Sequence, residues 1–527
     1  MNSHWKHIGN VTKTESERFH KALENPLLAQ ETCLWEILQS NANCETGLKY
    51  RFADIKTVRD YQSRIAVSDY THIENQITRI ANGEQNILYC GTTTALEQTS
   101  GSVSGSKLIP FTNTSLRYIR RGIFPWLYDL ITNQADITSG KMYWSVSPQT
   151  RAQQKTKSGI PVGFNSDAEY FGKKLASDIA AQSVWVEPTL HNNDIHKWRF
   201  LTARQLLTTS DLAFISIWSP TFILELFRFI QKHGKQLIDC IRTGAANGFQ
   251  ENIDSRFPAD PDRANVLCNA ITDKHINIEM VWPKLDMLSC WTHGSSSRFI
   301  PQLEQYFSVA QLQAKGLLAT EGIMSIPLCD SPDPVLSVNS GFYEFMDRNE
   351  NAYLCHEVNV GEKYRLLVTM PNGLYRYDTG DYIEITGTYR DTPTFRFVGR
   401  AKLSSDICGE KLNDAFVSER LRNIIGFSLL APSINPKPRY VLYLDSLQYD
   451  VTGARSITSI IEKLLQQNPQ YAYARQLGQL EELSFNLVDH PTEKYIQYEL
   501  AQGKKLGDIK PPCLRPETDW GTKFCRH

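Results

Sequence analysis

Glu97-Gln-Thr-Ser-Gly-Ser-Val-Ser-Gly-Ser-Lys-Leu-Ile-Pro110 is the stretch on which the fold assignment depends. Its glycines let the backbone turn tightly and approach a ligand, because glycine has no Cβ. Hydroxyls and successive backbone N–H groups in such a loop line a concave anion site, to which Lys107 adds a positive charge. The loop is not a Walker A motif, because Gly101 and Gly105 are too close together and no hydroxyl residue follows Lys107. The composition indicates either a phosphate-binding loop or a plain surface loop, and the rest of the chain decides between them.

Length and composition limit the class of protein. The chain has 527 residues, more than one compact core accommodates, so we expect two or more domains. A hydrophobic content of 41% is typical of globular proteins. The net charge of -1 argues against a surface for nucleic acid or for an anionic membrane.

The cysteines and the N-terminus indicate a reduced, intracellular protein. The 11 cysteines are odd in number and include no Cys-x-x-Cys pair, which argues against zinc-ribbon and thioredoxin-like sites. The N-terminus lacks the basic-then-apolar pattern of a signal peptide. The most apolar segment, residues 212–230, is interrupted by Ser219-Pro220 and Glu225, so we do not expect it to span a membrane. We therefore expect a soluble, cytoplasmic protein.

The first half of the chain is rich in predicted helix. Residues 1–80 are polar-amphipathic and predict helices. After the serine-rich loop, Thr114 is a candidate N-cap for a helix whose apolar residues recur at spacings of three and four. Arg117, Arg120 and Arg121 lie in the early turns of that helix. They form either a solvated basic face or a site where one arginine pairs with a carboxylate substrate, for which the planar guanidinium is suited.

Alternating strands and helices follow. Residues 212–218 predict a buried strand, and Ser219-Pro220 predicts the N-cap and first turn of a helix. A strand that leads into a helix is typical of α/β proteins, in which ligands bind at the carboxyl ends of strands. Two more buried strands are predicted over residues 276–282 and 287–291, and the second ends at Thr292-His-Gly294.

Two acidic corners are candidate binding positions. Glu321, within Thr320-Glu321-Gly322, is predicted at a strand-to-loop corner, where it is either a surface charge or a ligand that holds Mg²⁺ beside phosphates. Residues 341–400 alternate apolar and polar side chains and predict several strands. Between two of them, Tyr377-Asp-Thr-Gly-Asp381 predicts a tight turn. An aspartate there either serves the turn itself or accepts both hydroxyls of a ribose.

A domain boundary is expected near residue 400. The remaining residues predict strands over 440–444 and 483–488 and helices over 457–465 and 493–502. This mixture predicts a small α+β domain after a boundary near residue 400.

Four motifs, in this order along the chain, resemble the Gretchen Hagen auxin-responsive family of acyl acid amido synthetases, in its bacterial branch. That family belongs to the superfamily of acyl-CoA synthetases, nonribosomal adenylation domains and firefly luciferase. The resemblance covers residues 41–512, although the serine-rich loop is shorter than in plant members and Leu317 replaces an aromatic residue. The motifs are Thr99-Ser-Gly-Ser-Val-Ser-Gly-Ser-Lys-Leu-Ile-Pro110, Gly316-Leu-Leu-Ala-Thr-Glu-Gly322, Gly373-Leu-Tyr-Arg-Tyr-Asp-Thr-Gly-Asp381, and Phe397-Val-Gly-Arg400 with Gly409-Glu-Lys-Leu-Asn413.

The resemblance implies an α/β fold and an activity. A large N-terminal adenylating domain, residues 1–399, would combine β-sheets flanked by helices with a β-barrel-like part, and a small, mobile α+β domain would occupy residues 400–527. The enzyme would use ATP and Mg²⁺ to convert a carboxylic acid into an acyl-adenylate, and would then form an amide with an amine, such as that of an amino acid. An acyl-CoA or acyl-carrier-protein ligase shares the first step, and a catalytically silent nucleotide-binding protein is the remaining alternative.

The resemblance also assigns residues. The lysine that the C-terminal domain brings to the phosphates matches Lys510, with Lys504 and Lys505 as competitors. Glu321 would hold Mg²⁺, and the expected catalytic residues are Lys510, Lys107 and Glu321. The expected ATP- or AMP-binding residues are Thr99, Ser100, Gly101, Ser102, Ser104, Gly105, Ala319, Thr320, Glu321, Tyr343, Asp381 and Arg400. The expected acyl-substrate residues are Arg117, Arg121, Trp218, Ser219, Thr221 and Gly294. The expected partners are small-molecule acids and amines, without nucleic acid or membrane, and the oligomeric state is left open.

Overall fold

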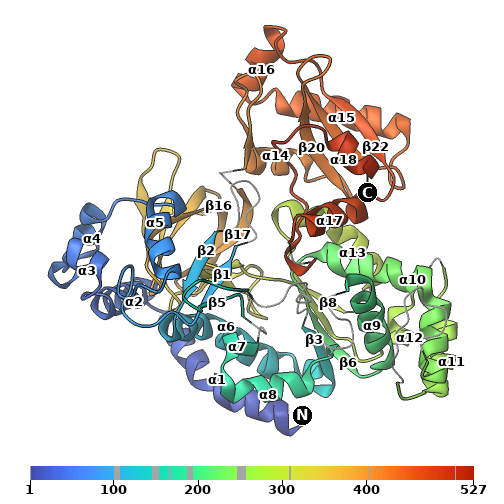
Figure 1. Cartoon of the computed structure of the whole chain (residues 1–527), viewed down its shortest axis with the longest axis horizontal. Helices are drawn as coiled ribbons and strands as arrows, with labels where there is room; N and C mark the ends of the chain where they lie inside the picture. Colours follow the sequence, from blue (N-terminus) through green and yellow to red (C-terminus); the bar gives the residue numbers. More distant parts are fainter. Residues whose placement is uncertain are drawn as a thin grey trace. The chain divides into compact units, whose positions relative to one another are not determined.

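The computed structural model describes residues 2–99, 107–144, 154–164, 168–186, 194–245, 257–273, 275–307, 310–400, 403–504 and 506–526 (Figure 1). The chain forms two units, and it passes between them five times. The first unit comprises Met1–Ser216, Trp282–Ser289 and Gln313–Arg396. The second comprises Ile217–Val281, Cys290–Leu312 and Phe397–His527. The boundary that we expect near residue 400 stays a prediction.

Polar residues at the helix starts explain the helices of the N-terminal segment. Asn2, Asn25, Thr57 and Asp69 each accept a hydrogen bond from a backbone N–H of the first turn. These bonds satisfy donors that have no partner within the helix. The prediction of helices over residues 1–80 is confirmed. The helices are α1 (Ser3–Ala22), α2 (Pro26–Ser40), α3 (Glu45–Lys49), α4 (Val58–Arg64) and α5 (Tyr70–Ala81), with a 3-10 turn η1 (Phe52–Asp54).

Helix α6 (Asn113–Asn133) follows the serine-rich stretch, but Thr114 is not its N-cap. Thr112 is the N-cap: its hydroxyl accepts a hydrogen bond from the Ser115 N–H, and the Ser115 hydroxyl accepts one from the Thr112 N–H. This reciprocal pair is a capping box, which Thr114 cannot form because it already lies inside the first turn. Helix α1 packs along α6 and α8 (Lys173–Gln182) in the first unit (Figure 1).

A seven-stranded sheet forms the strand-rich part of the chain, as predicted for residues 341–400. Its strand order is β11-β12-β17-β16-β15-β13-β14, and its inner strands β13, β15 and β16 pair antiparallel. Leu366 and Val368 of β15 belong to the same buried apolar cluster as Ile123 and Leu127 of α6. The strands are β11 (Ser325–Ile326), β12 (Val335–Leu336), β13 (Phe342–Met346), β14 (Ala352–Tyr353), β15 (Lys363–Met370), β16 (Leu374–Tyr389) and β17 (Thr392–Arg400).

The tight turn predicted over residues 377–381 is wrong. These residues lie inside strand β16, where the register against β15 shifts between Arg365 and Leu367. Gly380 has a φ of +75°, which glycine adopts without steric cost. The segment is therefore a bulge, which bends a strand and redirects its side chains instead of ending it.

Two further sheets have four strands each. The first contains the strands on either side of the serine-rich stretch, and the second contains parallel strands. In the second of them, β3, β6 and β7 pair parallel, as expected for an α/β arrangement. The predicted strands over 212–218 and 287–291 are confirmed as β6 and β7, slightly shortened. The sheets are β2 (Leu108–Phe111), β1 (Ala95–Gln98), β5 (Pro161–Val162) and β4 (Gln154–Lys155), and β3 (Lys141–Trp144), β6 (Leu212–Ser216), β7 (Met287–Cys290) and β8 (Gln311–Ala314). The first unit also contains α7 (Ala168–Phe171), α9 (Ile195–Thr208), η2 (Ala135–Ser139) and the short strands β9 (Leu318–Ala319) and β10 (Gly322–Ile323).

The second unit contains long helices and the C-terminal α+β part. As predicted, Ser219 is the N-cap and Pro220 the first residue of α10 (Pro220–Thr243). The strand predicted over 276–282 is wrong, because Asn277 accepts a hydrogen bond from the Met280 N–H and starts the short helix α12 (Ile278–Val281). The other elements before residue 400 are α11 (Pro261–Ala270), η4 (Gly294–Phe299) and α13 (Ile300–Tyr306).

The C-terminal segment is the predicted mixture of strands and helices. Its strands β20, β21 and β22 form one sheet, with β20 antiparallel and β22 parallel to β21. None of the described helices of the chain is long and apolar enough to cross a membrane. The segment contains β18 (Ser404–Ser405), β19 (Leu412–Asn413), α14 (Asp414–Leu421), β20 (Ser428–Ser433), β21 (Arg439–Asp445), α15 (Val451–Leu465), α16 (Pro469–Gln476), β22 (Ser484–Val488), α17 (Pro491–Ala501), η5 (Leu506–Asp508) and α18 (Trp520–Arg526).

Candidate active site

Strands β1 and β2 form an antiparallel hairpin in the first unit, on either side of the serine-rich stretch, and the Thr99 N–H donates to the Lys107 carbonyl oxygen over 2.9 Å. The hydroxyl of Thr99 is buried and has no hydrogen-bond partner within the described part of the chain. The predicted phosphate-binding residues of the loop lie outside the described residues; they are Ser100, Gly101, Ser102, Ser104 and Gly105.

Tyr70, the first residue of α5, holds the base of this hairpin. Its hydroxyl accepts a hydrogen bond from the Leu108 N–H over 3.1 Å. Its ring lies under the ammonium group of Lys107, whose Nζ is 5.6 Å from the ring centroid. Burial raises the pKa of Tyr70, so the ring carries a neutral hydroxyl. The N-terminus of α5 thus fixes the direction in which Lys107 leaves the hairpin.

Glu321 lies at a corner between two short strands, as predicted. Thr320 and Glu321 are the two residues that join β9 (Leu318–Ala319) to β10 (Gly322–Ile323), and Ala319 pairs with Gly322. Such a two-residue hairpin turn leaves both side chains outside the strand pair. A small pocket borders the turn and is lined by Phe111, Ser115, Glu321, Gly322 and Asn372 among others.

The segment before α5 joins the hairpin base to the bulge of β16. The Ser68 N–H donates to the Arg376 carbonyl oxygen over 3.1 Å, and the Asp378 N–H donates to the Ser68 carbonyl oxygen over 2.8 Å. Burial first, and then the negative charge of Glu321, raises the pKa of Tyr377. The structure therefore brings Glu321, the bulge and the Tyr70 contact together in one region of the first unit.

The two aspartates of the bulge have different surroundings. One oxygen of Asp378 accepts a hydrogen bond from Arg365 over 3.0 Å, and the other accepts one from the Gly380 N–H over 2.9 Å. Both carboxylate oxygens of Asp378 thus accept hydrogen bonds from within the protein. The Asp381 N–H donates to the Thr379 hydroxyl over 3.1 Å, and its side chain, 6% exposed, is not held by the Arg365 contact. Asp381 is the better candidate for a ribose.

Tyr343 lies in the core. It is fully buried, and its hydroxyl donates to the Ile323 carbonyl oxygen over 2.6 Å. Its backbone N–H donates to Gln30 of α2. Since Ile323 belongs to the short hairpin that carries Glu321, Tyr343 supports that hairpin, and the structure does not open its side chain to a ligand.

A buried ion pair lies behind the bulge, between Arg376 of the Gly373–Asp381 motif and Glu344 of β13. Arg376 has a φ of 45°, and its Nε donates to Glu344 over 3.0 Å. Its Nη1 donates to the carbonyl oxygens of Gln62 and Ile65. Arg376 thereby fixes the chain that leads into Ser68 and α5.

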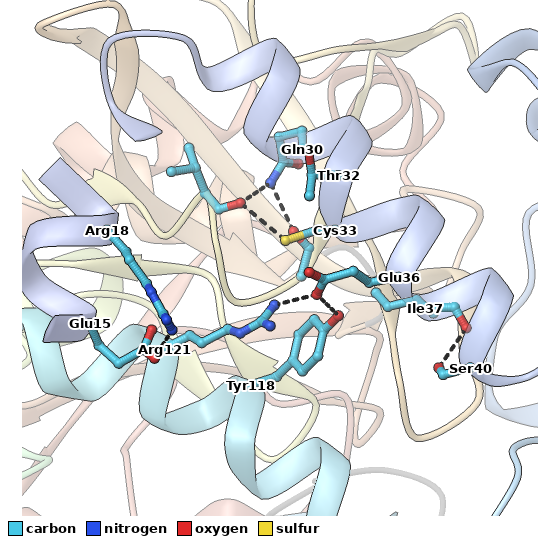
Figure 2. A network of polar contacts seen from close by, with 12 residues as sticks. Glu15, Arg18, Gln30, Thr32, Cys33, Glu36, Ile37, Ser40, Tyr118 and Arg121 are labelled. Atoms are coloured by element: carbon cyan, nitrogen blue, oxygen red, sulfur yellow. Dashed lines mark hydrogen bonds and ion pairs between the residues drawn. The ribbon is translucent and has the colours of Figure 1, made fainter. Parts of the chain in front are cut away.

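Arg121 faces helix α2. Figure 2 shows Arg121 and Tyr118 of α6 pointing towards Glu36 of α2. The Arg121 Nη1 donates to Glu36 over 2.7 Å, and the Tyr118 hydroxyl donates to the same oxygen over 2.9 Å. Burial opposes ionisation of Glu36, but the hydrogen bonds from Arg121 and Tyr118 lower its pKa overall. Arg117 is exposed, and Arg120 donates to the Tyr170 carbonyl oxygen. Tyr118 lines the pocket beside Glu321, and the acyl-substrate roles expected for Arg117 and Arg121 stay predictions.

In the second unit, Trp218, Gly294 and Lys510 come together around Trp291 and Phe397. The rings of Trp218 and Trp291 lie 5.6 Å apart. The Lys510 Nζ lies 4.4 Å from the Phe397 ring centroid and 5.2 Å from that of Trp291. A Cβ on Gly294, whose φ is +59°, would come within 2.8 Å of Phe397. A lysine against two aromatic faces is held by cation–π attraction.

Ser219 and Thr221 are both buried, and their hydroxyls hydrogen-bond each other over 2.7 Å at the start of α10. Arg400 is exposed at the end of β17. Among the candidate lysines, Lys504 forms an ion pair with Glu499, which also pairs with Arg515. Lys505 lies outside the described residues. Of the two lysines that the structure describes, Lys510 is therefore the one in an aromatic site.

The arrangement fits ATP and a magnesium ion. The unpartnered hydroxyl of Thr99 and the lysine beside it suit phosphate oxygens. Within the described residues, no group of three or more His, Cys, Asp or Glu side chains could hold a metal ion by itself.

Three family models match the chain in order. They are described as the GH3 family N-terminal domain over residues 15–312, the GH3 family central domain over 334–400 and the GH3 family C-terminal domain over 411–518. The chain is similar to indole-3-acetic acid-amido synthetase GH3.4 of Arabidopsis thaliana, with 23% identity over 96% of this chain and 93% of the relative. It is also similar to the probable indole-3-acetic acid-amido synthetase GH3.1 of Oryza sativa subsp. japonica, with 24% identity over 92% and 87%.

Solved structures match over almost the whole chain. The GH3.15 acyl acid amido synthetase has a TM-score of 0.81 at 21% identity, and the match covers 97% of this chain and 95% of that one. A 2-hydroxyisobutyryl-CoA ligase in the postadenylation state has a TM-score of 0.54 at 12% identity, over 97% and 93%. At these identities the likeness shows the fold, and it confirms the predicted α/β fold of acyl-adenylating enzymes.

Proposed function

Because the chain belongs to the GH3 family, we propose that it is an ATP-dependent acyl acid amido synthetase, an AMP-forming acid–amino acid ligase. In the first step a carboxylate oxygen attacks the α-phosphorus of ATP, which gives an acyl-adenylate and pyrophosphate. In the second step an amine nitrogen attacks the acyl carbonyl carbon, loses a proton, and AMP leaves as the amide forms. The observation that carries this proposal is the ordered match of all three family domains, from residue 15 to residue 518.

The first unit would bind the nucleotide. The loop between Thr99 and Lys107 would wrap the phosphates, with hydrogen bonds from hydroxyls and backbone N–H groups. Asp381 would accept both ribose hydroxyls, because an ionised carboxylate offers two acceptor oxygens. Thr320 and Ala319 would line the nucleotide, and Glu321 would hold Mg²⁺. When bound, this ion neutralises the charge that develops on the phosphate oxygens.

The second unit would bind the acid and supply the mobile lysine. Lys510 would stabilise charge on the phosphates in the first step, an electrostatic role that needs no proton transfer. Trp218 and Gly294 are supported as acyl-pocket residues by their position around the aromatic rings that hold Lys510. Arg400 would lie at the hinge near the boundary at residue 400, about which the C-terminal domain would move between the two steps.

Finer features of the proposal rest on the sequence. The short serine-rich loop and Leu317, in place of an aromatic residue, support the bacterial branch of the family. The 11 cysteines, odd in number and scattered along the chain, support reduced thiols and a cytoplasmic location. The expected substrates are a small carboxylic acid and an amino acid. The relatives' use of indole-3-acetic acid is a property of those proteins, and the acid used here is to be found by screening.

Acid-dependent exchange of pyrophosphate into ATP tests the first step. We expect exchange with at least one acid of a broad panel, and AMP release that then requires an added amino acid. Replacing Glu321 with Gln should slow exchange by ~10²–10³-fold, the usual effect of losing a well-placed electrostatic group.

Two outcomes would contradict the proposal. AMP release with coenzyme A and with no amine would identify an acyl-CoA ligase. Absence of exchange with every acid, while ATP still binds, would identify a silent nucleotide-binding protein.

A further inference from the structure

Arg298, in η4 of the second unit, is a buried arginine whose hydrogen bonds converge on one chain segment. It is only 2% exposed. Its Nη2 donates to the Pro511 carbonyl oxygen over 3.0 Å and to that of Pro512 over 3.2 Å. Its Nη1 donates to Cys513 Sγ and to Ser428 Oγ, each over 3.0 Å, and to the Ser428 carbonyl oxygen.

The other side of the same segment is also held. One carboxylate oxygen of Asp414 accepts hydrogen bonds from the N–H groups of Cys513 and Leu514, each over 3.1 Å. The Leu430 N–H donates to the Cys513 carbonyl oxygen over 2.8 Å. Carbonyl and N–H groups of the segment are therefore taken by different partners, so its backbone is fixed in position.

Lys510 directly precedes this segment. Its ammonium group lies on the rings of Trp291 and Phe397, and Trp291 belongs to the same stretch of chain as Arg298, Cys290–Leu312. Adjacent Cα atoms are ~3.8 Å apart, so a shift of the Pro511 backbone moves Lys510 with it.

We propose that Arg298 is a positioning residue that holds Lys510 in place for adenylate formation, and that its hydrogen bonds break before amide formation. This inference rests on the proposed function. The rigid fork of a guanidinium suits the role, because its donors reach several carbonyl oxygens at once and an ammonium group cannot match that geometry. The acceptors are neutral, so the segment can leave without stranding an unpaired carboxylate, and the contact is reversible.

Measuring the two half-reactions separately distinguishes a positioning role of Arg298 from a merely structural one. Arg298→Lys keeps the charge but loses the fork, and we expect pyrophosphate exchange to slow by ~10²-fold, as a displacement of about 1 Å typically does. Amide formation from supplied acyl-adenylate should keep at least its wild-type rate. Arg263→Lys is the matched control, since Arg263 is also a buried arginine of this unit that donates to a carbonyl oxygen, that of Val281.

A second measurement does not depend on activity. Cys513 is 2% exposed, and burial raises the pKa of its thiol, so it should react slowly with a maleimide while Arg298 holds it. Peptide mass spectrometry should find faster labelling of Cys513 in Arg298→Lys than in wild type or in Arg263→Lys. Equal slowing of both half-reactions, or Cys513 labelling no faster than in the control, would overturn the inference. Absence of exchange in the wild type would overturn the proposed function instead, and the labelling result would still report on the contact.

Discussion

Asp378 and Asp381 lie close together in strand β16, and the bulge of this strand gives them different hydrogen-bond partners. Asp378 is bound by Arg365 and by the backbone of Gly380. The backbone N–H of Asp381 donates to the Thr379 hydroxyl. From the sequence both aspartates could serve the turn or a ribose. The register shift that separates them depends on pairing with β15, which no local pattern reveals.

Replacing Asp381 with Asn should weaken ATP binding. The substitution keeps the shape but removes the charge and one acceptor, and hydrogen bonds to charged groups contribute ~1.5–3 kcal/mol. We expect the dissociation constant for ATP, measured by calorimetry, to rise ~10- to 100-fold with little change in the melting temperature.

Asp378→Asn is the control for that experiment. It should lower the melting temperature through loss of the Arg365 ion pair and leave ATP affinity close to that of the wild type. If the two variants exchange these phenotypes, the ribose belongs to Asp378.

At the scale of elements, apolar periodicity predicted where most helices and strands lie, but their ends were set by caps and bulges. Helix α6 starts from the reciprocal bonds of Thr112 and Ser115, and α12 starts from Asn277 within an apolar run that predicted a strand. Both errors have one cause. Hydrogen bonds between side chains and backbone N–H groups set where these helices start, and the apolar pattern does not indicate such bonds. The pairing of α6 with α2 through Arg121 was likewise hidden, because Glu36 is distant in sequence.

The Arg121–Glu36 pair predicts that Arg121 serves the α2–α6 packing. Arg121→Met should lower the free energy of unfolding at pH 7 without changing KM for the acid. The pKa of Glu36 is lowered in the folded state, so its ion pair stabilises the protein above its ordinary value of 4.5 and is lost as the pH falls through the lower folded value. Urea denaturation of the wild type and the variant should therefore differ at pH 7 and converge in acid.

Arg117→Met serves as the control, because Arg117 is exposed. It should change neither stability nor KM appreciably. A large rise in KM for the acid in Arg121→Met, with unchanged stability, would instead support the prediction from the sequence that Arg121 binds the acid.

At the scale of the whole molecule, the ordered motifs predicted the family and the fold, whereas the roles that they assign to Glu321 and Asp381 stay predictions. The residues that hold these motifs in place were not predictable. Tyr70 and Arg298 lie in stretches without a motif, and Arg376 lies in a motif that gave it no role, yet each contacts backbone atoms far away in the sequence. Local patterns carry no information about such partners. The division into two units was not predictable either. Each unit is built from three separate segments of the chain, whereas the sequence led us to expect a single boundary.

The C-terminal segment tests that boundary. Among the described residues, the members of its buried cluster, which include Leu412, Leu442, Ile461 and Leu514, lie within residues 412–514, and Ile407 and Cys408 pack against them. A fragment of residues 403–527 should therefore fold alone and melt cooperatively by circular dichroism. In that fragment Leu442→Ala, at a fully buried position, should cost ~2–5 kcal/mol and shift the transition, which would show that the native core has formed. A fragment without a cooperative transition would instead mean that this segment needs Ile217–Val281 and Cys290–Leu312, its partners in the second unit. The whole second unit would then be the folding domain, and the boundary expected near residue 400 would not separate two independently folding domains.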